Sequence, residues 1–113
     1  MHKILTGKCK RTFLKWIKIR VNSKLHEIYK IEFWFNLQDE SFKIALIIEW
    51  FDSVGIYIEI SFYDDCYWTY NIYSNKPVLE KETANICNNR QQATEEAIKK
   101  ANEIYNEKYS ISQ

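Results

Sequence analysis

Two short stretches of the sequence carry side chains of the types used in catalysis and metal binding. His26 and Glu27 are adjacent, and Asp64, Asp65 and Cys66 follow one another. A histidine acts as a base or a ligand only with a positioned partner, and no cysteine or second histidine stands at ligand spacing from His26. Two carboxylates without further oxygen ligands make a poor magnesium site, and Cys66 has no identifiable base. We therefore expect no catalytic residue and no bound metal.

The sequence also lacks the residues for two other common kinds of site. Its two glycines are too few for a glycine-rich loop that cradles phosphates. Its three cysteines, at positions 9, 66 and 87, are odd in number and widely spaced, which suits neither a disulfide framework nor a zinc site. We expect no cofactor and no enzymatic activity.

The distribution of charge is the most informative feature of the sequence. The first 24 residues contain eight of the sixteen basic residues and no acidic residue, whereas the remainder contains eight basic and fifteen acidic residues. Such a segment, with aromatic residues between its cations, is typical of a surface that faces phosphates or an acidic protein. Alternatively, it docks on the acidic remainder of its own chain. The candidate partner-binding or RNA-binding residues are Lys8, Lys10, Arg11, Lys15, Trp16, Lys18, Arg20 and Lys24.

A basic amphipathic helix over residues 9 to 22 would position these side chains. Phe13, Ile17 and Val21 recur at i, i+4 and i+8, which places them in one apolar stripe with the cations around it. Residues 13 to 21 also contain an alternating apolar pattern that fits a strand. We favour the helix.

A central helix is expected over residues 41 to 53, the most apolar part of the chain. Ile44, Ile47 and Phe51 stand at i, i+3 and i+7, together with Ile48, on one helical face. Gly55 follows where a left-handed residue ends a helix. The candidates for the N-terminal cap are Asp39 and Ser41. Residues 42 to 50 also alternate, so that a strand is the alternative there.

The following segments predict a small antiparallel sheet. Alternation of apolar side chains predicts strands over residues 56 to 63 and 66 to 73, which a turn at residues 64 and 65 would join into a hairpin. Residues 28 to 35 are rich in β-branched and aromatic types and are expected to form a short strand or an extended arm. Residues 78 to 83 are expected to add an edge strand.

The hairpin carries many aromatic residues, which have two readings. They could form a stacking surface for bases on one face of the sheet. Core packing or a protein interface is the favoured reading, because half of them must face the helices and nearby acidic residues would repel phosphate. The aromatic residues are Tyr57, Tyr63, Tyr67, Trp68, Tyr70 and Tyr73.

The C-terminal helix has the clearest pattern in the chain. Glu95 and Glu96 lie near its start, where acidic side chains complement the helix dipole. Its apolar stripe consists of Ala97, Ile98, Ala101, Ile104 and Tyr105. The expected fold is therefore an α+β single small domain. It has an antiparallel sheet of two to four strands, on which the N-terminal basic helix, the central helix and the C-terminal helix pack.

Length and composition indicate one globular unit. At 113 residues, the chain suits a single domain over residues 1–113, with flexible tails at residues 1–8 and 109–113. The 46% apolar and 16% aromatic content argues against disorder. No apolar run approaches the ~20 residues of a membrane span, and the N-terminus lacks the pattern of a secretory signal. We expect a cytoplasmic protein.

Two segments resemble those of a known group of proteins. Residues 50 to 58 read Trp-Phe-Asp-Ser-Val-Gly-Ile-Tyr-Ile, and residues 90 to 101 read Arg-Gln-Gln-Ala-Thr-Glu-Glu-Ala-Ile-Lys-Lys-Ala. Together with the tyrosine-rich hairpin between them, they resemble small hypothetical proteins of phages and prophages in Bacteroidetes and Flavobacteria. The resemblance implies an accessory gene of a mobile element. Small proteins of that class without catalytic residues are often inhibitors of host defence, including anti-CRISPR proteins that bind an RNA-guided nuclease.

Two functional hypotheses follow. The first is a non-enzymatic phage-type inhibitor in the cytosol of the host bacterium. It would bind a host defence complex, such as a CRISPR effector nuclease with its guide RNA, through the basic N-terminal helix, with Trp16 and Trp34 as anchors. The alternative is a free-standing nucleic-acid-binding accessory module of a phage. Salt-dependent binding to naked RNA or DNA would favour the second hypothesis, and a requirement for a protein partner would favour the first.

Overall fold

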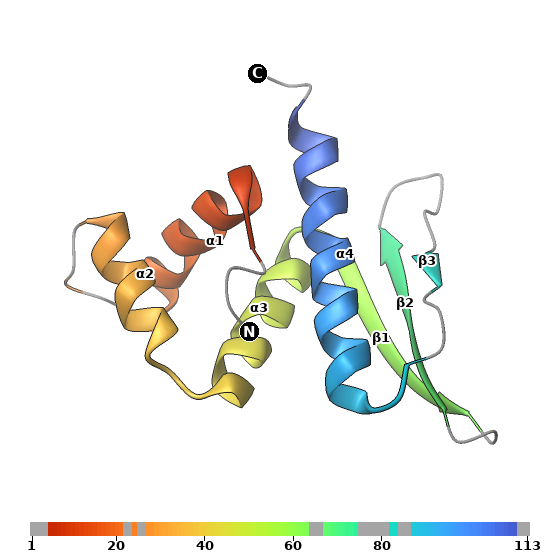
Figure 1. The fold of residues 1–113 in the computed structure, drawn as a ribbon. Coiled ribbons are helices and arrows are strands. Elements are labelled where there is room, and N and C mark those ends of the chain that lie inside the picture. The colour runs from red at the N-terminus through yellow and green to blue at the C-terminus, as the bar shows by residue number, and fades with distance from the viewer. Residues whose placement is uncertain are drawn as a thin grey trace.

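The computed structural model describes residues 5–21, 24, 27–63, 67–74, 82–83 and 87–110. These residues form four helices and a small antiparallel sheet, so that the predicted α+β fold is confirmed. Figure 1 shows α1 and α2 on one side of the molecule, the strands on the other, and α3 and α4 between them. The elements are α1 (Gly7–Arg20), α2 (Ile28–Asn36), α3 (Glu40–Ser53), β1 (Ile56–Tyr63), β2 (Tyr67–Ser74), β3 (Glu82–Thr83) and α4 (Arg90–Ser110).

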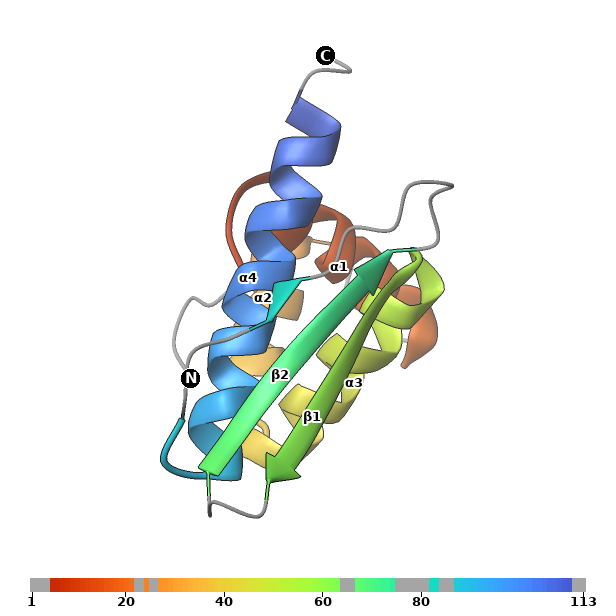
Figure 2. The same ribbon diagram turned by 90° about the vertical axis from the view of Figure 1, so that its right-hand side faces the viewer.

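The predicted hairpin of β1 and β2 is confirmed. The two strands pair antiparallel from Ile56 opposite Ser74 to Tyr63 opposite Tyr67, and the strand order is β1-β2-β3. Both α3 and α4 pack on the same face of the hairpin (Figure 2). The predicted turn at residues 64 and 65 lies outside the described residues. So do residues 78 to 81 of the predicted edge strand.

The core is centred on Trp50 of α3, which is 1% exposed. Its ring lies 5.8 Å from that of Phe13 in α1, 5.1 Å from that of Phe51 and 5.0 Å from that of Tyr105 in α4, measured between centroids. The cluster contains side chains of α1, α3 and α4, which are far apart in the sequence. Because burying one large apolar side chain contributes ~1.5–3 kcal/mol, the cluster stabilises the packing of these three helices.

Hydrogen bonds from α4 fix the start of α1. The backbone N–H of Thr6 donates to Oδ1 of Asn102 at 2.9 Å, and that of Cys9 donates to Oδ1 of Asn106 at 2.8 Å. The side chains of α4 thus accept from N–H groups that a helix start leaves without partners. Gly7 has a φ of 59°, a left-handed conformation that favours glycine.

The central helix is confirmed and slightly extended. It begins at Glu40 with Asp39 in the capping position, although the Asp39 side chain makes no capping hydrogen bond. Gly55 has a φ of 82° and ends the helix as predicted. Ile47 and Phe51 of the expected face are buried as predicted, but Leu46 and Trp50 complete the buried face, whereas Ile44 and Ile48 are half-buried.

The prediction for residues 28 to 35 was wrong, because they form helix α2. Ile31 is 0% exposed and Phe35 is 7% exposed, and the ring of Phe35 packs edge-on against that of Phe13 at 5.1 Å. As a strand, Phe33 would share that face, but it is 68% exposed. The helix satisfies its own backbone groups while burying one side on α1, so that packing overrides the strand propensity of the residue types.

Helical structure also extends into both segments that we expected to be tails. Helix α1 begins at Gly7, with Leu5 buried before it, and α4 continues to Ser110. At the other end, α4 begins at Arg90, because Oδ1 of Asn89 accepts from the backbone N–H of Gln92 at 2.8 Å. In the expected apolar stripe of α4, Ile104 is half-buried and the other four members are buried: Ala97, Ile98, Ala101 and Tyr105.

Candidate functional site

Helix α1 divides its side chains between the core and the surface. Cys9, Phe13, Leu14 and Ile17 are buried, as the predicted amphipathic helix requires. Its opposite side carries four cations at i, i+3, i+7 and i+10, a spacing that places them in one row along the helix. We call this row the basic stripe: Lys8, Arg11, Lys15 and Lys18.

The basic stripe faces outward. Arg11 and Lys15 are exposed, and Lys8 and Lys18 are half-buried. Among the residues that the structure describes, no acidic side chain forms an ion pair with Lys8, Arg11 or Lys15. Over ten residues, the stripe is about 15 Å long. It therefore offers a row of cations to an anionic partner.

Two other predicted binding residues pair with acids of their own chain. Lys10 Nζ lies 2.8 Å from Glu32 Oε2 of α2, and Arg20 Nε lies 2.7 Å from Glu49 Oε2 of α3. The hydrogen bond to Glu49 raises the pKa of Arg20. Both pairs are partly exposed, so they fix side-chain positions more than they stabilise the fold. The alternative reading, in which the segment docks on its own chain, thus applies to these two cations.

The remaining predicted residues occupy different positions. Trp16 is half-buried and packs against the core, with its ring centroid 6.1 Å from that of Phe13. Lys24 is exposed in the connection between α1 and α2. The structure thus gathers Lys8, Arg11, Lys15 and Lys18 on one surface, and it gives Trp16 a packing role.

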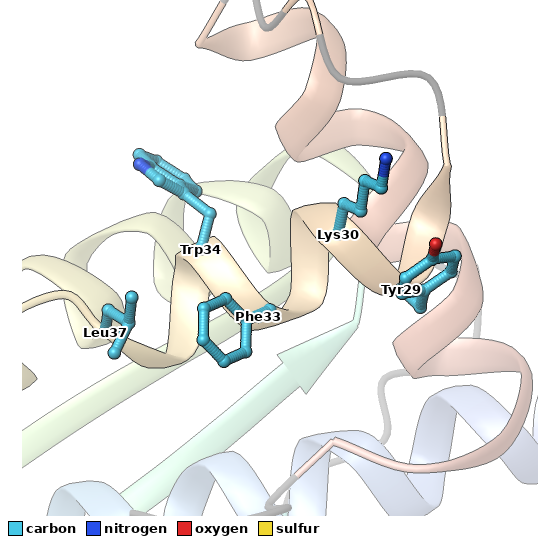
Figure 3. Close-up of a pocket in the computed structure, with 5 residues that line it drawn as sticks. All are labelled: Tyr29, Lys30, Phe33, Trp34 and Leu37. Atoms are coloured by element: carbon cyan, nitrogen blue, oxygen red, sulfur yellow. The ribbon is translucent and has the colours of Figure 1, made fainter.

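The outer side of α2 is a second surface, which was not predicted from the sequence. Tyr29, Phe33 and Leu37 are 65%, 68% and 69% exposed and stand at i, i+4 and i+8. They line a shallow hollow of about 560 Å³ together with Lys30 and Trp34 (Figure 3). The i, i+4 spacing was readable in the sequence, but assigning a strand to these residues concealed it.

The two described thiols do not suit nucleophilic chemistry. Cys9 is 0% exposed, and burial raises the pKa of its thiol to about 12. Burial, followed by the hydrogen bond to Glu96 and its charge, raises the pKa of the Cys87 thiol to about 11. Its Sγ donates to Glu96 Oε2 at 2.7 Å. A thiol becomes a nucleophile or a metal ligand as the thiolate, and these environments favour the protonated form.

The other candidates for chemistry are dispersed or lie outside the described residues. His26, Asp64, Asp65 and Cys66 are outside them. Within the described part of the chain, no three side chains among histidine, cysteine, aspartate and glutamate gather as metal ligands would. The helices in that part of the chain include none with the length and apolar content to cross a membrane.

Among the described side chains of the hairpin, the aromatic rings do not form an exposed row on which bases could stack. The ring of Trp68 packs at 4.8 Å from that of Phe62, and the Arg90 guanidinium lies 4.8 Å over it. On the other face, Glu59 stands between the tyrosines and accepts hydrogen bonds from Asn71 at 3.0 Å and from Tyr73 at 3.5 Å. A carboxylate in that position disfavours the approach of phosphates.

Comparisons of the chain with protein-family models, with curated proteins and with solved structures find no match.

Proposed function

We propose that this protein is a non-enzymatic binding protein that attaches to a ribonucleoprotein by placing the basic stripe on the phosphate backbone of RNA. The observation that supports the proposal is the stripe itself, four cations on the outward side of a helix that contains no acidic residue. The resemblance to phage and prophage proteins favours a host defence complex as the target, such as an anti-CRISPR protein would inhibit.

The electrostatics of the stripe favour an anionic partner. Lys8, Arg11, Lys15 and Lys18 form successive like-charge neighbours at i, i+3 or i+4, and such pairs destabilise a helix by about 0.2–0.5 kcal/mol each. A phosphate backbone that lies along the stripe removes this repulsion and releases counterions. Phosphate contacts carry no sequence information, so target selection rests on the protein component of the complex.

The buried apolar side of α1 sets the direction in which the stripe faces. Cys9, Phe13, Leu14 and Ile17 are buried, which fixes the rotation of the helix about its axis. The ion pairs with Glu32 and Glu49 hold the side chains of Lys10 and Arg20 against α2 and α3. The row of cations is therefore presented by a rigid helix, which reduces the entropy lost on binding.

The proposal is tested by affinity purification from a bacterial host lysate. The tagged protein is compared with a charge-reversal variant, in which Lys8, Arg11, Lys15 and Lys18 are changed together to Glu. The matched control is Lys99→Glu, because Lys99 is an exposed cation of α4. We expect the wild type and the control to recover one ribonucleoprotein, identified by mass spectrometry, and the charge-reversal variant to lose it.

Treatment of the lysate with RNase and DNase separates the two functional hypotheses. An inhibitor that docks on a specific complex still recovers the protein component after mild nuclease treatment, because the guide RNA is protected within it. Recovery of many unrelated proteins that disappears with nuclease indicates a free-standing nucleic-acid-binding module. Recovery of the same complex by the charge-reversal variant would contradict the role of the stripe.

A further inference from the structure

The outer side of α2 exposes more apolar area than a surface helix normally does. We call this surface the α2 apolar face and define it by Tyr29, Phe33 and Leu37, each about two-thirds exposed. Large side chains of this kind carry ~150–250 Å² each, so the three expose ~300–500 Å² together. This is the size of the largest apolar patch on a typical monomer, and such patches are often functional.

The surface is shaped as a shallow groove along one helix. Figure 3 shows Trp34 and Lys30 rising from one edge of the α2 ribbon, and Phe33 and Tyr29 lying toward the other. The hollow that these side chains line with Leu37 measures about 560 Å³. From Tyr29 to Leu37 the face is about 12 Å long, which is the length of two turns of a helix laid beside it.

The net positive charge of the two N-terminal helices and their connection indicates the sign of the occupant. Residues 5 to 37 contain eight basic residues and two acidic ones, of which Glu27 accepts a hydrogen bond from the Tyr29 hydroxyl. Glu32 is already paired with Lys10. Lys30 lines the groove itself. An occupant with carboxylates beside its apolar side chains would complement this surface, and a basic occupant would be repelled.

A second copy of this chain fits the groove poorly. A two-fold interface would bring two basic helix pairs together and set Lys30 near its own symmetry mate. The area of ~300–500 Å² also falls short of the ~800 Å² per partner in a standard stable interface.

We propose that the α2 apolar face binds an acidic amphipathic helix of a protein partner. The apolar side chains of that helix, at i, i+3 or i+4 and i+7, pack between Trp34 and the row formed by Tyr29, Phe33 and Leu37, as in other helix-in-groove complexes. Its carboxylates face Lys30. This surface is distinct from the basic stripe and does not require RNA.

The test is a selection from a displayed library of helical peptides of about 20 residues. Leucine is fixed at i, i+4, i+7 and i+11, and the other positions vary among glutamate, lysine, glutamine and alanine. The targets are the wild type and the double variant Phe33→Ala with Leu37→Ala, whose fold is preserved because both side chains are exposed. Tyr57→Ala is the matched control, since Tyr57 is an exposed aromatic residue of the hairpin.

We expect peptides selected on the wild type to be enriched in glutamate over lysine. They should bind the Tyr57 control equally and the double variant at least about tenfold more weakly, because its two apolar anchors are gone. Lys30→Glu should also weaken them. A selected pool without excess glutamate, or equal binding to the double variant, would overturn the proposal.

Two further measurements exclude the other occupants. If analytical ultracentrifugation shows a dimer that the double variant loses, the face belongs to a second copy and the proposal is wrong. If the double variant loses affinity for a single-stranded RNA as well as for the peptides, the aromatic side chains stack on bases and the proposal is also wrong. Unchanged RNA affinity, with loss of peptide binding, supports a protein helix as the occupant.

Discussion

Neutralising the basic stripe should abolish RNA binding while making the fold slightly more stable. The perturbation changes Lys8, Arg11, Lys15 and Lys18 together to Gln. Two like-charge neighbour pairs, Lys8 with Arg11 and Arg11 with Lys15, involve cations without an ion pair among the described residues, so removing this repulsion should stabilise the domain by about 0.4–1 kcal/mol. For a domain of 113 residues, that raises Tm by up to roughly 4 °C. If these four residues were needed only for the fold, replacing them would lower Tm.

The magnitude of the binding effect follows from counterion release. Four phosphate contacts to a single strand give a slope of about −2.8 for the logarithm of affinity against the logarithm of salt concentration. Affinity should thus fall roughly 50-fold between about 50 mM and 200 mM salt. Arg11→Gln alone should make the slope shallower by about 0.7, and Lys99→Gln should leave it unchanged.

The assay is fluorescence anisotropy of a labelled RNA of about 16 nucleotides, measured over that range of salt. Both functional hypotheses place the stripe on phosphates, so this assay tests the stripe, and the nuclease treatment of the lysate distinguishes the two hypotheses. The quadruple Gln variant should show a slope near zero, and circular dichroism should give its Tm. An unchanged slope in the quadruple variant would refute the assignment of the stripe as the phosphate contact. A fall in Tm of several degrees would show instead that the stripe supports the fold.

Three further predictions concern the fold. Gly7→Ala should destabilise the domain by about 1–2 kcal/mol in urea unfolding, since φ is 59° there and the added Cβ would lie 3.2 Å from Asn106 Oδ1; unchanged stability would contradict the left-handed conformation. Ile47→Asp should abolish the cooperative thermal transition, because Ile47 is 1% exposed and would leave a buried charge unpaired; a near-native melt would disprove this core position. In a variant without the third cysteine, Cys9 and Cys87 should react with a disulfide reagent only after unfolding, because their thiols are buried and their pKa values raised; rapid reaction of the native protein would argue against this burial.

Patterns that depend on one element alone were readable in the sequence. The apolar spacing of α1, α3 and α4 predicted each helix, and Gly55 marked the end of α3 correctly. The alternation of apolar and polar residues from 56 to 63 predicted β1, because successive side chains of a strand point to opposite faces of the sheet.

Features that depend on contacts between elements were not readable. Residues 28 to 35 have the composition of a strand, and only the packing of Ile31 and Phe35 on α1 selects the helix. Helix α4 begins at Arg90 because the Asn89 side chain caps it. An asparagine in a polar connection can equally form a turn, so its sequence position did not predict a helix cap. Sequence patterns report propensity, and tertiary packing decides between close alternatives.

The candidate site was predicted in part. The basic character of the N-terminal segment is a property of its composition, so it could be predicted from the sequence. Helical spacing decides which cations share the row, whereas the pairing of Lys10 with Glu32 and of Arg20 with Glu49 depends on how α2 and α3 pack beside α1 and could not be predicted. The α2 apolar face could not be found before α2 itself was recognised as a helix.

An NMR titration decides whether the basic stripe of α1 contacts RNA phosphates. Backbone amide shifts of the labelled protein are followed as a single-stranded RNA of about 16 nucleotides is added at low salt. We expect the perturbed amides to cluster along α1 around Arg11 and Lys15 and those of β1 and β2 to stay unchanged. Perturbations that cluster around Tyr57 and Tyr73 on the hairpin, or no perturbation at all, would contradict it.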